Sequence, residues 1–512
     1  MRGIFLGIAL GALLLPLYAH AGFTFQNVID QARERAAKPY QPPPEIPKFM
    51  RELGFHDYQN IRFDPAKSLW RDDNSQFNVM FLSPGLFYGH SVAMNVIDAQ
   101  GVHPVQYQKS YFRFEDPELE RRVPPDLGFA GFKLTFPFFE PDIPNQFLVF
   151  AGASYFRGVG KHNAWGISAR GVAIDTGLPS GEEFPSFVEF WLERPRPEAK
   201  SVTFYGLLDG KSLSGAYRFV VTPGEQTSMQ VRAVLFPRGP VALLGVAPLT
   251  SMFYYGENTS RPVGEWRGEV HDSDGLLIRD GASAEWLWRP LINPTNLQMD
   301  YFHTENLRGF GLLQRDSHFT HYQDLGARYE LRPTAWVEPL GDWGKGQVVL
   351  VQLPTPNETN DNVVAFWTPA AKIDKPGQML FDYRIRFGGP DLVQEPLGRS
   401  LNTFVGDGNR IGGGNEEGAY RLIVDFAGGP LQEISSKAPV VGKVTALEGG
   451  EMIEQFVEYN EPLKAWRLSI LARPEKGKPL SLRAFLSEGE RTLTETWTYR
   501  LPPENGILPE AK

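Results

Sequence analysis

Apolar and polar residues alternate along several short segments of this chain, which is the pattern of strands with one buried face. The clearest examples carry apolar residues at every second position of 77–81, 92–96, 217–221 and 231–235. Turns rich in Gly, Pro, Asn and Asp separate such segments at short intervals. The pattern predicts an antiparallel, mainly β fold, in which two packed sheets form a large N-terminal β-sandwich.

One segment near the N-terminus has helical spacing instead. Val28, Ala32 and Ala36 share one face of FQNVIDQARERAAKPY, and this segment ends before a proline cluster at 42–47. The spacing predicts a helix. Long segments without clear alternation are predicted as loops, and loops of such length usually build a site. They cover 153–186, 256–300 and 304–346.

A Gly-rich segment without periodicity, residues 389–418, is predicted as a linker region between two domains. Alternation then resumes in three segments, 422–426, 466–470 and 480–484. This predicts a small immunoglobulin-like β-sandwich over 419–512, after the large sandwich over 22–388. Trp466 and Trp497 fit strand interiors, so we expect them in the core of the smaller domain.

The first 21 residues predict a Sec signal peptide. Arg2 is followed by the apolar run IFLGIALGALLLPLY and then by Ala19-His20-Ala21, a small-x-small cleavage site. The run is short for a membrane span and the single Arg does not fit the twin-Arg route, so we expect no direct membrane insertion. The chain has no cysteine, which excludes disulfide-stapled scaffolds and thiolate chemistry. These features together predict a periplasmic protein.

Composition narrows the classes of partner. The formal net charge is −9, which argues against nucleic acid or an anionic membrane surface as a partner. Aromatic residues make up 13% of the chain. Many of them belong to the core, but aromatic planes also bind the CH-rich faces of sugar rings.

Several enzyme classes lack their motifs in this sequence. There is no GxSxG and no HExxH, and GASYFRGVG lacks the GK[ST] ending of a phosphate loop. The segment HDSDG begins like a calcium loop, but the Glu that should complete such a loop is missing at its spacing. We therefore predict no metal and no cofactor.

Four loop segments concentrate carboxylates, arginines and aromatic side chains, which are the residue types of carbohydrate sites. From spacing alone, the carboxylates of ETND could equally form a solvated turn, and D-S-D-G could be a simple Asx turn. The candidate residues are Tyr155, Arg157, Trp165, Arg170, Glu182 and Glu183 in the first segment (152–185); His271, Asp272 and Asp274 in the second (269–276); Tyr329 and Arg332 after the third (303–316); and Glu358 and Asp361 in the fourth (354–369).

Long motifs closely resemble the periplasmic glucan biosynthesis protein G family (OpgG or MdoG, with its paralogue OpgD). They run through nearly the whole chain and include LGFAGFKLTFP, GASYFR, FWLERP, LGVAPLTSMF, EVHDSDGL, GFGLLQRD and ETNDNVVAFWTP. The resemblance implies a galactose-mutarotase-like β-sandwich followed by an immunoglobulin-like domain. It also implies a periplasmic role in making osmoregulated periplasmic glucans, which are branched β-1,2-linked glucose polymers.

The resemblance further implies an inverting endo-β-1,2-glucanase. Its general acid would be Asp361 and its general base Asp272, with Asp274 as the less favoured base. Substrate-binding residues expected in the same cleft are Glu358, Tyr329, Arg170, Trp165, Tyr155 and Arg332. Glu358 could also act on Asp361 as a neighbouring like charge.

A second hypothesis remains open. The chain could be a non-catalytic glucan-binding or branching-assembly factor that works with the inner-membrane glucan glucosyltransferase, using the same cleft. Both hypotheses predict a β-1,2-glucan polymer or oligosaccharide as the partner. A lectin-like adhesin has no support beyond the β pattern.

Overall fold

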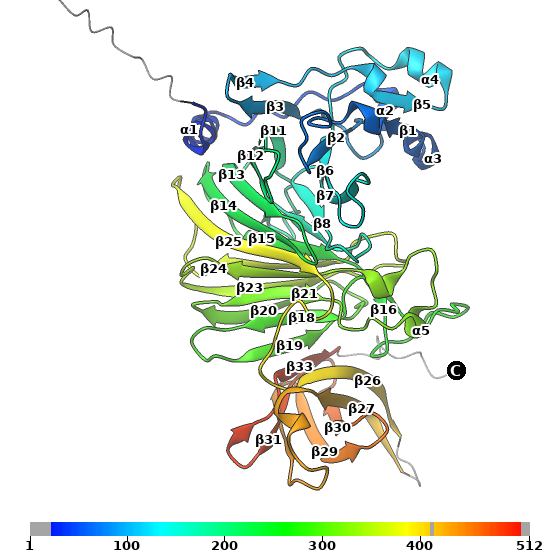
Figure 1. Ribbon diagram of the computed structural model, residues 1–512. Helices are drawn as coiled ribbons and strands as arrows, with labels where there is room; N and C mark the ends of the chain where they lie inside the picture. Colours follow the sequence, from blue (N-terminus) through cyan, green and yellow to red (C-terminus); the bar gives the residue numbers. More distant parts are fainter. Residues whose placement is uncertain (1–21, 410–413, 503–512) are drawn as a thin grey trace, which may run out of the picture.

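The computed structural model describes residues 22–409 and 414–502, so the predicted signal peptide lies outside the described residues. The described chain is mainly β, as predicted (Figure 1). No helix within 22–409 or 414–502 is both long enough and apolar enough to cross a membrane.

Two large sheets form the body of the molecule. The first has the order β2-β6-β7-β8-β9-β15-β24-β23-β20, with β10 also paired to β15. Its strands are β2 (Asn78–Leu82), β6 (Gly131–Phe136), β7 (Asn145–Ala151), β8 (Tyr155–Gly158), β9 (Ser168–Arg170), β10 (Val172–Ile174), β15 (Leu244–Ser251), β20 (Gln298–Glu305), β23 (Lys345–Gln352) and β24 (Val363–Pro369).

The second sheet has the order β28-β31-β33-β19-β18-β21-β22-β25-β14-β13-β12-β11-β3-β4, with β32 paired to β31. Its strands are β3 (Ala93–Asp98), β4 (Gly101–Pro104), β11 (Ser186–Glu193), β12 (Val202–Asp209), β13 (Leu213–Thr222), β14 (Thr227–Pro237), β18 (Gly275–Arg279), β19 (Trp286–Pro290), β21 (Gly309–Leu313), β22 (Thr334–Pro339), β25 (Met379–Gly388), β28 (Val441–Glu448), β31 (Leu480–Glu488), β32 (Arg491–Thr492) and β33 (Thr496–Leu501).

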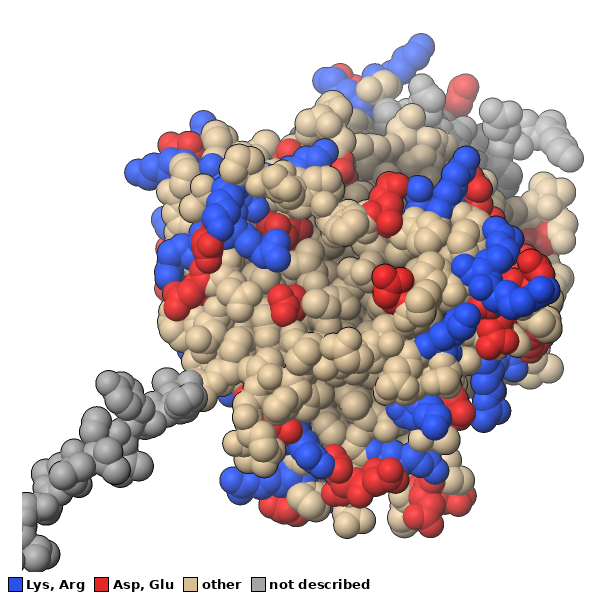
Figure 2. All heavy atoms as spheres, turned by 90° about the horizontal axis from the view of Figure 1, so that it is seen from above, with Lys and Arg blue, Asp and Glu red and all other residues tan. Residues whose placement is uncertain are grey.

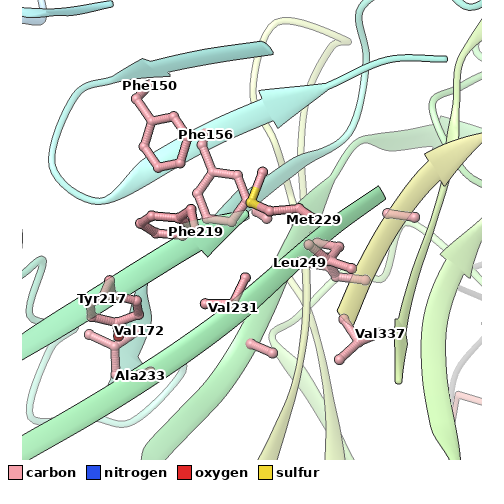
Figure 3. Packing of buried hydrophobic residues seen from close by; sticks show 14 of the residues in the cluster. Phe150, Phe156, Val172, Tyr217, Phe219, Met229, Val231, Ala233, Leu249 and Val337 are labelled. Carbon is pink, nitrogen blue, oxygen red and sulfur yellow. The ribbon is translucent and has the colours of Figure 1, made fainter. Parts of the chain in front are cut away.

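Aromatic side chains fill the space between the two sheets. Phe150 on β7 stacks on Phe156 of β8, with ring centroids 4.7 Å apart, and meets Phe219 of β13 edge-on at 5.1 Å (Figure 3). All three rings are almost completely buried. Each such ring contributes roughly 1.5–3 kcal/mol through the apolar surface that it removes from water. Much of the aromatic content is therefore structural.

The predicted N-terminal helix is confirmed as α1 (Phe25–Ala36), and it lies across β12–β14 (Figure 1). Its buried residues Val28 and Ala32 pack against Tyr205 and Val234. Further short elements surround the first strands: α2 (Lys48–Arg51), α3 (Phe55–Gln59), α4 (Pro117–Arg122), η1 (Pro65–Lys67), η2 (Lys109–Tyr111) and the pair β1 (Ile61–Phe63) and β5 (Phe112–Phe114).

The alternating segments predicted as strands form β2, β3, β13 and β14, but the three long loops are only partly irregular. They contain short strands that extend both sheets, among them β8, β18 and β21. The prediction of unbroken loops was wrong. Strands β18 and β21 are buried on both faces, so their sequences show no alternation, whereas β8 alternates but is only four residues long. The remaining elements of this region are β16 (Phe253–Tyr255), β17 (Val270–His271), α5 (Phe319–Tyr322) and η3 (Tyr329–Leu331).

The C-terminal sandwich packs a four-stranded sheet against β28, β31 and β33 (Figure 1). The four-stranded sheet comprises β26 (Arg399–Asn409), β27 (Asn415–Ala427), β29 (Gly450–Asn460) and β30 (Ala465–Pro474), and η4 (Gly429–Gln432) follows β27. Trp466 and Trp497 are buried in this core at 4% and 0% exposure, which confirms their predicted place.

The linker prediction for 389–418 is wrong over much of its length. Residues 399–409 form β26, which pairs antiparallel with β27. Strand pairing depends on backbone hydrogen bonds, so a Gly-rich segment can pair without a regular apolar pattern. The two sandwiches also share one sheet, since Leu287 and Trp288 of β19 pair in parallel with Thr496 and Trp497 of β33.

Figure 2 views the molecule from the end that carries β3, β4 and α4. Lys and Arg side chains on this face are intermingled with Asp and Glu, mainly around its margin, and the centre is mostly uncharged. This face has no large basic patch of the kind that nucleic acids select.

Candidate functional site

A cavity with a volume of about 730 Å³ opens over β6–β8 and the loop that precedes β24. Aromatic rings, amides and a few charged groups line it, which is the mixture that sugar hydroxyls and ring faces require. Four candidate residues, Tyr155, Arg157, Trp165 and Asp361, are among its lining residues. The others are Leu82, Phe87, Tyr88, Lys133, Gln146, Val149, Ala151, Gly152, Ala153, Phe156, Ser168, Thr359 and Asn360.

Strand β8 presents two of these side chains to the cavity. Tyr155 and Arg157 are two positions apart and therefore point to the same face, while Phe156 between them points into the core. Arg157 donates through Nε to Ser168 Oγ at 2.7 Å, and its Nη2 lies 3.7 Å from Asp361 Oδ2. Arg157 was a candidate residue, and alternation along SYFRG places it on the same face as Tyr155, but no local pattern indicates its contact with Asp361, which lies far away in the chain.

Asp361 lies at the mouth of β24, with 30% of its side chain exposed. Its neighbour Asn362 is buried, and its side chain forms hydrogen bonds with backbone groups of Phe253 and Leu353. Asn362 Oδ1 accepts from the amide of Phe253 at 2.8 Å, and Nδ2 donates to the carbonyls of Phe253 and Leu353. Asn362 therefore anchors the Asp361 loop to β16.

The same segment anchors Asp272. The Asp272 amide donates to the carbonyl of Met252 at 2.8 Å, and His271 pairs with Phe253 in the β16–β17 ladder. Met252 and Phe253 therefore connect the two aspartate loops, since Met252 is hydrogen-bonded to Asp272 and Phe253 to Asn362, the neighbour of Asp361. The sequence analysis did not find this connection, because Asn362 and Met252 lie 110 positions apart in the chain.

Asp272 is 7% exposed and does not line the cavity itself. Its Oδ1 is buried without a hydrogen-bond partner, and Arg332 Nε lies 3.4 Å from that oxygen. Burial raises the pKa of Asp272, Arg332 lowers it, and the charge of Asp361 raises it. The two aspartates, 89 positions apart in the sequence (272 and 361), therefore interact electrostatically across the site.

Arg332 connects the buried aspartate to the cavity wall. Its Nη1 donates to the carbonyl of Trp165, and its guanidinium lies over the Tyr329 ring, 5.2 Å from the centroid. Tyr329 is only 3% exposed, and burial, followed by the charges of Glu358 and Asp272, raises its pKa. Arg332 and Tyr329 thus hold Asp272 from behind and do not contribute to the lining of the cavity.

Asp274 has a different environment from Asp272. Its Oδ2 accepts from the backbone amides of Arg315 and Asp316, the latter at 2.9 Å. Burial raises the pKa of Asp274 to about 6, although His271 and the Asp316 amide act in the opposite direction. A carboxylate that holds two backbone amides is poorly placed to take a proton from water, which favours Asp272 of the two.

His271 lies behind both aspartates and is buried. Its Nε2 lies 2.9 Å from Glu269 Oε2 and 3.6 Å from Asp274 Oδ1, and its Nδ1 lies 3.0 Å from Gln314 Oε1. Burial disfavours the charged ring, but the Asp274 and Glu269 carboxylates outweigh this and raise the pKa of His271 to about 9. The charged imidazolium of His271 therefore stabilises the two carboxylates of this buried cluster.

Arg170, predicted as a substrate-binding residue, is 4% exposed and does not line the cavity. It donates to Thr250 Oγ1 at 2.9 Å, pairs with Glu182, and lies 4.7 Å from the centroid of the Tyr155 ring. Arg170 therefore does not line the cavity directly, and its role in substrate binding stays a prediction. Arg170 supports the ring of Tyr155 instead.

Glu358 also has a different partner from the one expected. Both of its oxygens pair with Arg267, at 2.9 and 3.0 Å, and Arg267 also binds Glu265 and Asp324. Its charge is thus largely offset by Arg267, so it is not a free like charge beside Asp361. The sequence analysis missed Arg267, and its position 91 residues from Glu358 gave no local signal.

The chain matches the model of a family described as "Periplasmic glucan biosynthesis protein, MdoG" over residues 23–501. It is 43% identical to "Glucans biosynthesis protein G" of Ralstonia nicotianae over 503 residues, which cover 97% of this chain and 99% of that protein. It is 42% identical to "Glucans biosynthesis protein G" of Dickeya dadantii over 499 residues, covering 96% of this chain and 95% of that one.

Proposed function

The chain belongs to the MdoG family of periplasmic glucan biosynthesis proteins, and from this premise we propose that it is an inverting endo-β-1,2-glucanase. Its substrate is the β-1,2-linked backbone of osmoregulated periplasmic glucans, and it acts in the periplasm beside the inner-membrane glucosyltransferase that makes the polymer. One observation carries the proposal: an exposed Asp361 on the wall of a sugar-sized cavity interacts with a buried Asp272 whose Oδ1 accepts no hydrogen bond from the described residues.

Asp361 is the general acid in this proposal. It lies on the cavity wall beside Tyr155, whose ring offers a stacking surface for a glucose unit. A glucan bound in the cavity brings a glycosidic oxygen to the Asp361 carboxyl. The protonated carboxyl then donates to the departing glycosidic oxygen.

Asp272 is the general base. Its Oδ1 accepts no hydrogen bond from the described residues, so it can accept a proton from a water molecule, and Arg332 at 3.4 Å favours the ionised form that this step requires. In inverting enzymes the two carboxyl groups stand roughly 6.5–9.5 Å apart, which leaves room for the attacking water. Water then attacks the anomeric carbon from the face opposite the leaving oxygen.

The proposal predicts the products. Purified mature chain incubated with linear β-1,2-glucan should release shorter reducing oligosaccharides, and their new reducing ends should initially be the α-anomer, because inversion converts the β-linkage. Chromatography with ¹H NMR of the first products measures both. Initial release of the β-anomer contradicts the inverting mechanism, and the absence of shorter products contradicts hydrolysis altogether.

The ion pair between Arg332 and Asp272 predicts how the rate of the proposed hydrolysis depends on pH. Arg332→Met removes the positive charge that lowers the pKa of Asp272. That pKa should rise, so the base is ionised only at higher pH, and the acidic limb of the kcat/KM profile should move to higher pH. Initial rates measured across the pH range test this. Arg113→Met, at an arginine whose side chain is 74% exposed on β5, is the matched control and should leave the limb in place.

A non-catalytic glucan-binding or branching-assembly factor is the second candidate. The contact of Arg157 Nη2 with Asp361 Oδ2 at 3.7 Å favours it, since the guanidinium already pairs with the carboxyl oxygen that an acid would present to the glycosidic bond. Under this hypothesis the chain binds linear β-1,2-glucan, measurable by calorimetry, without shortening it. The product analysis above therefore separates the two candidates.

A further inference from the structure

Two histidines and an aspartate lie together outside the cavity, in the segment RDSHFTHY that leads into α5. Asp316 Oδ1 is 3.1 Å from His318 Nδ1, and Asp316 Oδ2 contacts His321 Nδ1. The two imidazole rings are 5.2 Å apart between centroids. One ligand atom from each of the three residues lies within 4.8 Å of the other two.

These separations suit a small divalent ion. Zinc binds imidazole nitrogen and carboxylate oxygen at roughly 2.0–2.2 Å, so tetrahedral ligand atoms lie about 3.3 Å from one another. The His318 Nδ1 to Asp316 Oδ1 distance of 3.1 Å is already close to this value. An ion between the three groups would replace the hydrogen bonds that the rings now share with the carboxylate, and small side-chain movements suffice.

The carboxylate at the centre of this cluster is held in place before any ion binds. Asp316 Oδ1 accepts from the His318 amide at 2.9 Å, and the Asp316 amide donates to Asp274 Oδ2 at 2.9 Å. The hydroxyl of Tyr322, which is buried, donates to the Asp316 carbonyl at 3.2 Å. The Asp316 side chain is 13% exposed, whereas those of His318 and His321 are 74% and 47% exposed. A fixed carboxylate with two accessible imidazoles leaves open positions for water ligands.

We propose that Asp316, His318 and His321 form a binding site for a divalent transition-metal ion such as Zn²⁺. Two imidazoles and one carboxylate favour zinc, copper or nickel, whereas Mg²⁺ and Ca²⁺ prefer sites built from oxygen ligands. The site is distinct from the buried cluster of Glu269, His271 and Asp274. In that cluster the positive charge of the His271 imidazolium balances the neighbouring carboxylates.

The ion would fix α5 against the loop that carries Arg267. The carbonyl of His321 lies so close to Gly268 that a Cβ at this glycine would stand 2.4 Å from it. Gly268 follows Arg267, the partner of Glu358. An ion bound at His321 would therefore fix the backbone next to the Arg267–Glu358 pair. It would take no part in the proposed hydrolysis.

Calorimetric titration of ZnCl₂ into the mature chain, prepared without a histidine tag and stripped with EDTA, tests the site. We expect one equivalent of Zn²⁺ to bind and MgCl₂ to give no binding heat. His318→Ala and His321→Ala should each weaken the affinity by at least about tenfold, since each removes a direct ligand. Both side chains are largely accessible, so both variants should keep the circular dichroism spectrum of the parent chain.

His303→Ala is the matched control, because His303 is exposed on β20, where its Nδ1 lies 3.2 Å from Gln347 Nε2. Its Zn²⁺ affinity should equal that of the parent. A parent chain that binds no Zn²⁺ overturns the proposal, and so does a His318→Ala/His321→Ala double variant that binds it as tightly as the parent. The measurement needs no glucan, so its outcome is independent of the proposed hydrolase.

Discussion

Asp361→Asn should lower the rate of β-1,2-glucan cleavage by a factor of about 10² to 10⁴, the usual contribution of a general acid. Asparagine has nearly the same shape but cannot supply the proton that the leaving oxygen needs. Glucan affinity should change little, because Tyr155 and Trp165 still line the cavity. Release of reducing ends measures the rate, and calorimetry on the inactive variant measures the affinity.

Asp30→Asn on α1 is the control, because its carboxylate is 55% exposed and remote from the cavity lining. It should retain full activity.

Asp272→Asn should match Asp361→Asn in its loss of rate, since it removes the base. Asp274→Asn should instead reduce stability, because its carboxylate accepts two backbone amides. Unchanged turnover in Asp361→Asn contradicts the acid assignment, and loss of turnover in Asp274→Asn but not Asp272→Asn contradicts the base assignment.

Arg315→Met should destabilise the protein by about 3–5 kcal/mol, the usual cost of leaving a buried ion pair without one partner. The Arg315 side chain is 5% exposed and pairs with Glu495, at 0%, and with Glu395, at 4%. It also donates to the carbonyl of Ser400 at 3.1 Å and lies 3.5 Å from the centroid of Trp288. Methionine has a similar volume, so the loss comes from the charge and its hydrogen bonds. Urea unfolding measures the change in free energy.

This arginine also joins the C-terminal sandwich to the aspartate loop. Its backbone amide donates to Asp274, while its side chain binds Glu495 next to β33. Arg491→Met is the matched control, since the Arg491–Glu433 pair lies in the same sandwich with side chains 52% and 73% exposed. An exposed pair of this kind contributes under about 1 kcal/mol. Equal destabilisation by the two substitutions contradicts the role of Arg315 as a buried connection.

The sequence analysis was accurate where structure follows from neighbouring residues. Alternation located β13 and β14, helical spacing located α1, and the burial of Trp466 and Trp497 followed from their strand context. It failed where partners come from distant parts of the chain. Residues 399–409 form a strand because β27 pairs with them, and this pairing requires no apolar pattern.

The candidate site residues also fall into two groups, those that line the cavity and those that pair with residues elsewhere in the fold. Asp361, Tyr155 and Trp165 lie at the cavity as expected, whereas Arg170 and Glu358 are occupied by Glu182 and Arg267. Charged side chains look alike in a sequence whether they face water, a ligand or an opposite charge. Burial and ion pairing separate these cases, and both depend on the assembled fold.

By itself, the sequence determined the mainly β architecture, the terminal helix and the loops that carry the aspartates, because side-chain periodicity and turn chemistry act over a few neighbouring residues. Only the tertiary structure decided that Asp272 is buried with an Oδ1 that accepts no hydrogen bond from the described residues, while Asp274 is bound to backbone amides. It also decided that the two sandwiches share a sheet through β19 and β33. These outcomes depend on contacts between residues far apart in the chain, which no local pattern encodes.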